Sequence, residues 1–321
     1  MKIANSKMKK LNEILDVDYP IIMAPMFLVT NTKMMIEAMN SGIAACIPAL
    51  NFRTIEELEN AINEIRNNTN SGGLGINLIV NKSNIKVYKQ LESCVKLGVD
   101  FIITSLGSPK HVIQQCKLKG IKVFCDVVEE KYAKKVEELG ADAVIAVNKN
   151  AGGHAGNLSS EELFNIISKN CNLPVISAGG VGTKQGVTEK LEIGFSGLSI
   201  GSPFIACEEA QISEKYKQAC VDYGKEDIVF TTKISGTPCT VINTPYVQQT
   251  GTTQNWIEKI LSKNKKLKKW VKMITYFKGM KSIENAAFSN TYKTVWCAGP
   301  SIEHTNQILP IKKIVDKFIS F

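Results

Sequence analysis

The sequence predicts an α/β protein built as a (β/α)8 TIM barrel, followed by a C-terminal helical subdomain or lid. Three observations predict this fold. Eight short apolar runs rich in Val and Ile recur along the chain, amphipathic segments separate them, and no glycine-rich loop follows the first run. Eight β-then-α units within about 200 residues fit a closed barrel.

The apolar runs are continuous rather than alternating, which is typical of strands buried on both faces of a parallel sheet. We expect strands within residues 20–26, 43–50, 74–80, 101–107, 122–128, 143–148, 174–180 and 197–204. The competing arrangement is an open doubly wound sheet, whose phosphate loop follows the first strand. Here the first run ends in Ala24-Pro25-Met26-Phe27, without glycine, which disfavours a Rossmann dinucleotide site.

The segments between these runs carry helix signals. Residues 54–67 begin with Thr54 and have Glu57 three positions later, which is the pattern of a capping box before an apolar stripe. Residues 159–168 repeat the pattern with Ser159 and Glu162. A third helix, over residues 131–139, is predicted to end at Gly140.

The chain after the eighth run lacks the βα rhythm. Helical stretches are expected at 213–223, 256–261 and 267–280, around an irregular piece at 231–251 that is rich in Thr, Gly and Pro. We therefore expect a barrel over residues 1–205 and a helical lid or extension packed on it over residues 206–321.

Composition narrows the class of protein. The chain has 321 residues, of which 44% are hydrophobic and 21% charged, an ordinary globular balance. No apolar run is long enough to span a membrane, and the N-terminus lacks a secretory apolar core, so a cytoplasmic location without membrane contact is expected. The nine cysteines are widely spaced and read as reduced, mostly buried thiols. Only three histidines occur, none at ligand spacing from a cysteine, so no metal site is expected.

Much of the net charge of +9 lies in residues 262–281, which contain eight lysines. The simplest interpretation is a solvated helix face. Attraction of an anionic ligand, a nucleic acid or a membrane surface is the alternative. Aromatic residues are sparse there and no nucleic-acid-binding module is visible, so no nucleic-acid partner is expected.

The active site of such a barrel lies where strands end and βα loops begin. After the sixth run comes Gly152-Gly153-His154-Ala155-Gly156, which presents an imidazole among glycines. At a strand end this predicts a general base that works near neutral pH. The alternative is a histidine that only stabilises a glycine-rich turn.

The seventh and eighth runs end in Ala178-Gly179-Gly180 and Gly201-Ser202. The loops after these two strands commonly bind phosphate in TIM barrels through backbone N–H groups. Absent or small side chains leave those amides open, so the two segments predict a phosphate site.

Together these motifs resemble the FMN-dependent nitronate monooxygenases, formerly called 2-nitropropane dioxygenases, and the related FMN-dependent enoyl-acyl-carrier-protein (enoyl-ACP) reductases. The matching pieces are residues 20–26 (Pro-Ile-Ile-Met-Ala-Pro-Met), 75–78 (Gly-Ile-Asn-Leu), 151–156, 176–181 and 199–202, with 235–243 as a similar later stretch. The Gly-Gly-His-x-Gly element is the most specific of them.

The resemblance implies FMN as the cofactor and a role for each matching residue. Ala24, Pro25 and Met26 would lie against the flavin ring, and Asn77 would bond its edge. Gly152 and Gly153 would pack near the ring or ribityl chain. The phosphate would be held by Gly179, Gly180, Gly201 and Ser202, with Ala178 beside them. His154 would be the catalytic base or a polar orienting group.

Other strand-end residues are less determined by the resemblance. Asp126 is expected to line the cofactor site, although it could instead cap the next helix; Ser105 and Lys149 are further strand-end residues. Relatives often carry an acid where Asn150 stands and Gln or Glu where Val147 stands. The loop after the first strand is Phe27-Leu28-Val29-Thr30 rather than glycine-rich, and it shapes the substrate pocket.

The resemblance implies oxidation of alkyl nitronates with molecular oxygen as the reaction. NAD(P)H-dependent enoyl-ACP reduction is the alternative, in which the basic segment would meet an acidic carrier protein. A non-catalytic flavin-binding module is the second alternative.

An IMP dehydrogenase-like barrel needs a cysteine in the loop after the sixth strand, where this chain has His154. A homodimer is the default expectation for a soluble enzyme.

Overall fold

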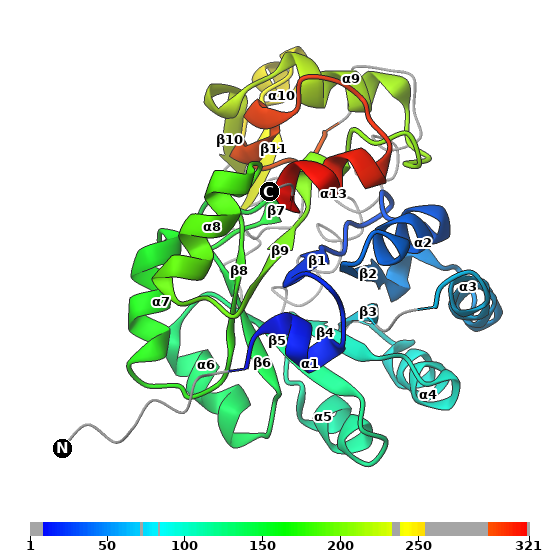
Figure 1. Cartoon of the computed structure of the whole chain (residues 1–321). Helices are drawn as coiled ribbons and strands as arrows, with labels where there is room; N and C mark the ends of the chain where they lie inside the picture. The colour runs from blue at the N-terminus through cyan, green and yellow to red at the C-terminus, as the bar shows by residue number, and fades with distance from the viewer. Residues whose placement is uncertain (1–8, 71–72, 83, 233–237, 254–294, 320–321) are drawn as a thin grey trace, which may run out of the picture.

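Eight parallel strands close into a barrel in a computed structural model that describes residues 9–70, 73–82, 84–232, 238–253 and 295–319. Around the barrel the order is β1-β2-β3-β4-β5-β6-β8-β9, and β9 pairs with β1 to close it (Figure 1). Each predicted run holds one of these strands. They are β1 (Ile21–Met23), β2 (Ala44–Pro48), β3 (Leu74–Ile79), β4 (Phe101–Ser105), β5 (Lys122–Val127), β6 (Ala143–Val147), β8 (Val175–Ala178) and β9 (Gly197–Ile200).

Helices surround the barrel, and their sequence signals are confirmed. The capping boxes at Thr54 and Ser159 are both formed, with Glu57 and Glu162 bonding back to the cap backbone. The third predicted helix is α6 (Glu130–Glu138), which ends just before Leu139 and Gly140, and Gly140 has φ of +90°. The helices that cover the strands are α2 (Thr32–Asn40), α3 (Ile55–Asn67), α4 (Val87–Leu97), α5 (Lys110–Lys117), α6 (Glu130–Glu138), α7 (Ser160–Ser168) and α8 (Lys184–Ile193).

A short N-terminal helix, α1 (Leu11–Leu15), closes the end of the barrel where strands begin. The Leu11 backbone N–H donates to the Ser196 carbonyl at 2.8 Å, just before β9. Leu11 and Leu15 belong to the same buried cluster as Phe101 and Phe124 from the barrel interior. Within the described residues, this end of the barrel interior is therefore packed with side chains.

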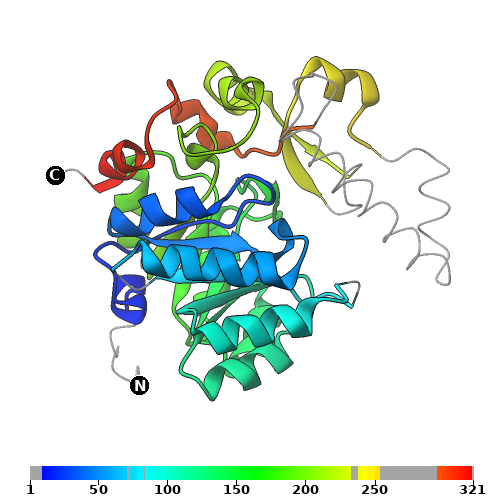
Figure 2. The same cartoon turned by 90° about the vertical axis from the view of Figure 1, so that its right-hand side faces the viewer.

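The chain after β9 contains strands as well as helices. Strands β10 (Ile228–Thr231) and β11 (Cys239–Ile242) form an antiparallel sheet with β7 (Gly153–His154), a two-residue strand from the loop after β6. Figures 1 and 2 show this sheet with α9 (Glu214–Asp222) and α10 (Pro245–Thr250) at one end of the barrel. The segment expected to be irregular therefore holds β11 and α10.

The remaining predicted helices of this region either match the structure or lie outside the described residues. The helix expected at 213–223 is α9. The helices expected at 256–261 and 267–280, and the basic segment 262–281, lie outside the described residues. The last helix, α13 (Ile311–Ile319), packs on the barrel against α2 and α8. The division of the chain at residue 205 stays a prediction.

The structure also describes four short 3-10 helices. These are η1 (Ala49–Asn51) after β2, and η2 (Ser202–Phe204), η3 (Lys225–Asp227) and η4 (Pro300–His304) after β9. Among the described helices, none combines the length and apolarity needed to cross a membrane.

Candidate functional site

A cavity of about 800 Å³ lies at the open end of the barrel, where the parallel strands end. This volume is in the range of small-molecule and cofactor sites. The residues predicted to bind the cofactor or to act as the base all line this one cavity: Ala24, Pro25, Met26, Asn77, Asp126, Gly152, Gly153, His154, Ala178, Gly179, Gly180, Gly201 and Ser202. The rule that barrel sites form at strand ends thus located the cavity from the sequence.

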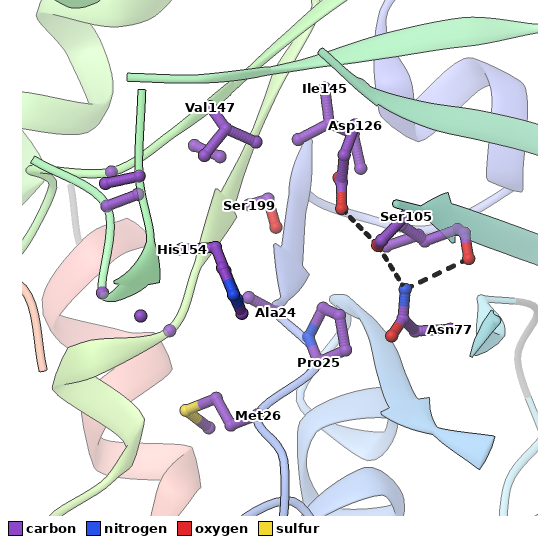
Figure 3. A pocket seen from close by; sticks show the side chains of 18 of the residues that line it. Ala24, Pro25, Met26, Asn77, Ser105, Asp126, Ile145, Val147, His154 and Ser199 are labelled. Carbon is purple, nitrogen blue, oxygen red and sulfur yellow. Dashed lines mark hydrogen bonds between the residues drawn. The ribbon is translucent and has the colours of Figure 1, made fainter. Parts of the chain in front are cut away.

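His154 reaches the cavity from β7, where it lies opposite Cys239 of β11. The Thr240 hydroxyl holds the adjoining loop by donating to the Ala151 carbonyl at 2.6 Å. In Figure 3 the imidazole points into the space that Ala24, Pro25 and Met26 border. Its ring is accessible from the cavity, yet the surrounding protein removes enough water to lower the pKa of His154 below 6.5. The imidazole is therefore neutral at neutral pH and able to accept a proton.

The two glycine-containing loops that follow β8 and β9 meet the His154 loop. Gly179 has φ of +110°, and a Cβ there would lie 2.5 Å from the Ala151 nitrogen. The Ser202 hydroxyl accepts a hydrogen bond from the Gly299 N–H at 2.8 Å. The first approach requires glycine at position 179 and brings the loops after β6 and β8 together. The second ties the start of η2, after β9, to the residue before η4.

Backbone donors in these loops remain open. No hydrogen bond within the described residues uses the backbone N–H of Gly180, Gly201 or Ser202. These three residues and Gly179 line the cavity. A group of unused N–H donors facing one space is suited to an anion such as a phosphate.

The loop after β1 forms an apolar wall, and a residue that the sequence did not single out holds it in place. Asn51, in η1 after β2, accepts from the Leu28 N–H at 2.9 Å and donates to the Thr30 carbonyl at 2.8 Å. The Thr30 hydroxyl accepts from the Met26 N–H at 3.0 Å. Leu28 has φ of +59°, a conformation that leucine rarely adopts. The loop is thus fixed by hydrogen bonds to Asn51, which the sequence of the loop itself does not predict.

A hydrogen-bond chain crosses the ends of β3, β4 and β5 on the facing side of the cavity (Figure 3). Asn77 Nδ2 donates to Ser105 Oγ at 2.8 Å, and Ser105 Oγ donates to Asp126 Oδ2 at 2.5 Å. Burial raises the pKa of Asp126 from 3.8 to about 6, although the Ser105 hydrogen bond opposes this shift. Asp126 does not cap the next helix, whose N-cap residue is Glu129.

Other residues also line the cavity. Val147 and Asn150 do so, as their positions near the end of β6 suggest. Cys239, Cys297 and Ser301 reach it from the C-terminal region. Lys149 is not among the lining residues. Within the part of the chain that the structure describes, no cluster of three His, Cys, Asp or Glu side chains could hold a metal ion.

Sequence comparison identifies relatives of this chain. The profile of the family described as "Nitronate monooxygenase" matches residues 82–320. A protein of Rhodococcus jostii named "(3aS,4S,5R,7aS)-5-hydroxy-7a-methyl-1-oxo-octahydro-1H-indene-4-carboxyl-CoA dehydrogenase" is 26% identical over 74% of this chain and 66% of its own length, so the match spans just under two thirds of that relative. A "Probable nitronate monooxygenase" of Staphylococcus aureus (strain Newman) is 25% identical over 75% of this chain and 79% of its own length.

Solved structures share the fold. FabK from Thermotoga maritima superposes with a TM-score of 0.83 at 24% identity and covers 96% of this chain and 94% of its own. A nitroalkane oxidase from Streptomyces ansochromogenes gives a TM-score of 0.76 at 18% identity, with 96% of each chain covered. At these identities the likeness supports the barrel architecture and nothing finer.

Proposed function

Since this chain belongs to the nitronate monooxygenase family, a family of flavin oxidoreductases, we propose that it binds FMN and oxidises alkyl nitronates with molecular oxygen. One observation carries the proposal. The imidazole of His154 and the open amides after β8 and β9 face the same cavity of about 800 Å³.

The residues around the cavity fit FMN. The unused N–H groups of Gly180, Gly201 and Ser202 suit its phosphate, and Gly179 lines the cavity beside them. A Cβ added at Gly201 would lie 3.5 Å from Ala24 Cβ and 3.7 Å from the thioether Sδ of Met26. The phosphate side of the cavity therefore adjoins the apolar wall. That wall, Ala24-Pro25-Met26, offers a flat ring an apolar face. Asn77 and Asp126 offer polar atoms on the other side, and Gly152 and Gly153 leave room beside His154.

FMN, when bound, supplies two-electron oxidation and reactivity with oxygen. The protein's residues contribute binding and proton transfer. A nitronate is already an anion, so the chain has only to bind it beside hydrogen-bond donors. A neutral nitroalkane must first lose its α-proton, and a nitrogen of the neutral His154 imidazole would accept it. The lowered pKa of His154 keeps the base form populated at neutral pH.

The His154→Ala protein tests this role. It should lose activity on neutral nitroalkanes far more than on pre-formed nitronates, because only the former need a base. His111→Ala is a matched control, since His111 packs edge-on against Tyr88 and does not line the cavity. Equal activity of wild type and His154→Ala on neutral nitroalkanes would remove His154 as the base.

The cofactor and electron donor can be tested together. The purified protein should show a flavin absorption spectrum, and propyl-2-nitronate added without oxygen should bleach it. Absence of bound flavin after FMN is added would contradict the assignment of the β8 and β9 loops. The partners under this proposal are the small-molecule substrate and oxygen.

Reduction of an enoyl thioester is the second candidate. The Rhodococcus jostii relative is named for a carboxyl-CoA compound, and an exposed lysine, Lys135, lines the cavity of this chain, where it could meet an anionic carrier. Bleaching of the flavin by NADH but not by nitronate would favour this candidate over the first.

A further inference from the structure

The hydrogen-bond chain from Asn77 to Asp126 has a direction that its geometry determines. Asn77 Nδ2 donates to the Ile103 carbonyl at 3.2 Å as well as to Ser105 Oγ at 2.8 Å. A carbonyl can only accept, so the Asn77 amide must turn its NH2 group toward Ile103. Both N–H bonds of Asn77 are then used, and its Oδ1 is left as an acceptor.

The same logic applies to the next two residues. Ser105 Oγ accepts from Asn77, so its single proton is directed to Asp126 Oδ2 at 2.5 Å. Oδ2 of Asp126 is therefore an acceptor whether or not the carboxyl group is ionised. When Asp126 is protonated, the proton has to sit on Oδ1.

Both remaining oxygens open onto the cavity. No described residue donates to Asn77 Oδ1 or Asp126 Oδ1. Among the described residues, the one enclosed side-chain polar atom without a partner is Asn12 Oδ1, so neither of these two atoms is sealed in protein. Since Asn77 and Asp126 line the cavity, they present an acceptor and a titratable oxygen to its contents.

Burial favours the acid form of Asp126 near neutral pH, with a pKa of about 6. Neighbouring thiol and phenol groups stay neutral there, because burial raises the pKa of Cys125 and Tyr132 to about 12 and raises the pKa of Cys46 well above its usual value. Among the described residues, the titratable or charged ones that face Asp126 or share its cavity are Cys46 of β2, Cys125 of β5, Tyr132 and Lys135 of α6, Glu129 before α6, His154 of β7, Cys239 of β11 and Cys297.

We propose that Asp126 binds the flavin as a neutral carboxylic acid, with Oδ1–H donating to a ring carbonyl while Asn77 Oδ1 accepts from a ring N–H, and that Ser105 is the positioning residue for both. An acceptor next to a donor complements an imide-type edge, such as that of the flavin pyrimidine ring. This inference rests on the proposed function. Where Asp126 is ionised, binding takes up one proton from solvent.

The experiment measures the dissociation constant of riboflavin by fluorescence quenching from about pH 5 to about pH 8. Riboflavin is the probe because the phosphate of FMN itself titrates near pH 6. We expect the dissociation constant to be flat below about pH 6 and to rise up to about tenfold per pH unit above it.

Two variants make the assignment specific. Asp126→Asn keeps a donor at this position and should bind riboflavin with a constant that no longer changes across this pH range. Ser105→Ala removes the hydrogen bond that lowers the pKa of Asp126, so the inflection should move to higher pH. Asp142→Asn is the matched control, since Asp142 accepts from the Val123 N–H at the opposite end of β5. It should keep the wild-type profile.

Three outcomes would overturn the inference. They are a wild-type dissociation constant that does not change with pH, an Asp126→Asn protein that retains the wild-type profile, and a Ser105→Ala inflection that stays in place or moves to lower pH. In each case riboflavin still binds, so the proposed function survives. Failure of both riboflavin and FMN to bind at any pH would overturn the proposed function and this inference with it.

Discussion

Cys239 lies directly opposite His154 in the antiparallel pairing of β11 with β7. The proposed base is thus held by a strand from the C-terminal region and not by its own loop alone. Next to this pair, the buried Thr240 hydroxyl donates to the Ala151 carbonyl. The position of the imidazole in the cavity therefore depends on contacts between distant parts of the chain.

Thr240→Val removes the hydroxyl at nearly constant volume. We expect a loss of about 1 kcal/mol in the free energy of unfolding, since one buried carbonyl loses its donor. Turnover of neutral nitroalkanes should fall more than turnover of nitronates, because the first needs His154 in place. Thr104→Val is the control: its hydroxyl contacts Cys125 at 3.2 Å in the barrel wall, away from the cavity. A similar selective loss in Thr104→Val would refute the positioning role.

The pH dependence of nitroalkane turnover follows from the pKa of His154. Burial lowers this pKa below 6.5, so the neutral base persists to a lower pH than an exposed histidine would allow. We expect the acid limb of kcat/KM for a neutral nitroalkane to fall below pH 6.5. The same limb should be missing when nitronate is the substrate. An acid limb above that pH would count against the assignment.

Gly179→Ala should damage both stability and the site. A Cβ would lie 2.5 Å from the Ala151 nitrogen, at a backbone φ of +110°. We expect a loss of about 1–3 kcal/mol in the free energy of unfolding and weaker FMN binding, measured by denaturation and by fluorescence titration. Gly98→Ala is the matched control: its φ is also positive, at +64°, but nothing lies within 4 Å of the added Cβ. It should lose about 1 kcal/mol and bind FMN normally.

Asn51→Ala tests whether the apolar wall is held from outside its own loop. Leu28 N–H and the Thr30 carbonyl would both lose their partner, so the loop after β1 should loosen. We expect FMN affinity to fall several-fold, with about 1–2 kcal/mol lost in the free energy of unfolding. Asn40→Ala removes a surface bond to the Asn68 carbonyl and should leave FMN affinity unchanged. Unaltered affinity in Asn51→Ala would show that the loop is rigid without this residue.

Asp126→Asn should stabilise the flavin-free protein at neutral pH. The folded protein raises the pKa of Asp126 from 3.8 to about 6, so it binds this proton more tightly than the unfolded chain. The stabilisation that the wild-type protein gains from protonated Asp126 is fully present below pH 3.8 and is lost as pH rises through about 6. Urea denaturation above pH 6 should show Asp126→Asn more stable than wild type by up to roughly 3 kcal/mol, with the difference shrinking in acid. A destabilised variant at pH 8 would contradict this prediction.

Much of the fold could be predicted because its signals are local. Continuous Val- and Ile-rich runs mark strands buried on both faces, and Thr54 and Ser159 mark helix starts through residues three positions away. The residues of the site could be located because strand ends share one edge of a barrel. None of this required long-range information.

The remaining features arise from contacts between distant segments. β7 has two residues, too few for any periodic pattern, and forms only because β11 supplies its partner. Asn51 resembles any polar residue after a strand, yet it fixes the loop after β1. The left-handed Leu28 contradicts the local preference of leucine, so tertiary packing decides its conformation.

The packing of α13 between α2 and α8 has a consequence for synthesis of the protein. One neighbour, α2, comes from the start of the chain, while α13 comes from residues 311–319. The ring of helices around the barrel therefore cannot be complete until residues 311–319 have left the ribosome. Until then the apolar faces that α13 covers, on α2 and α8, are available to chaperones or to other nascent chains.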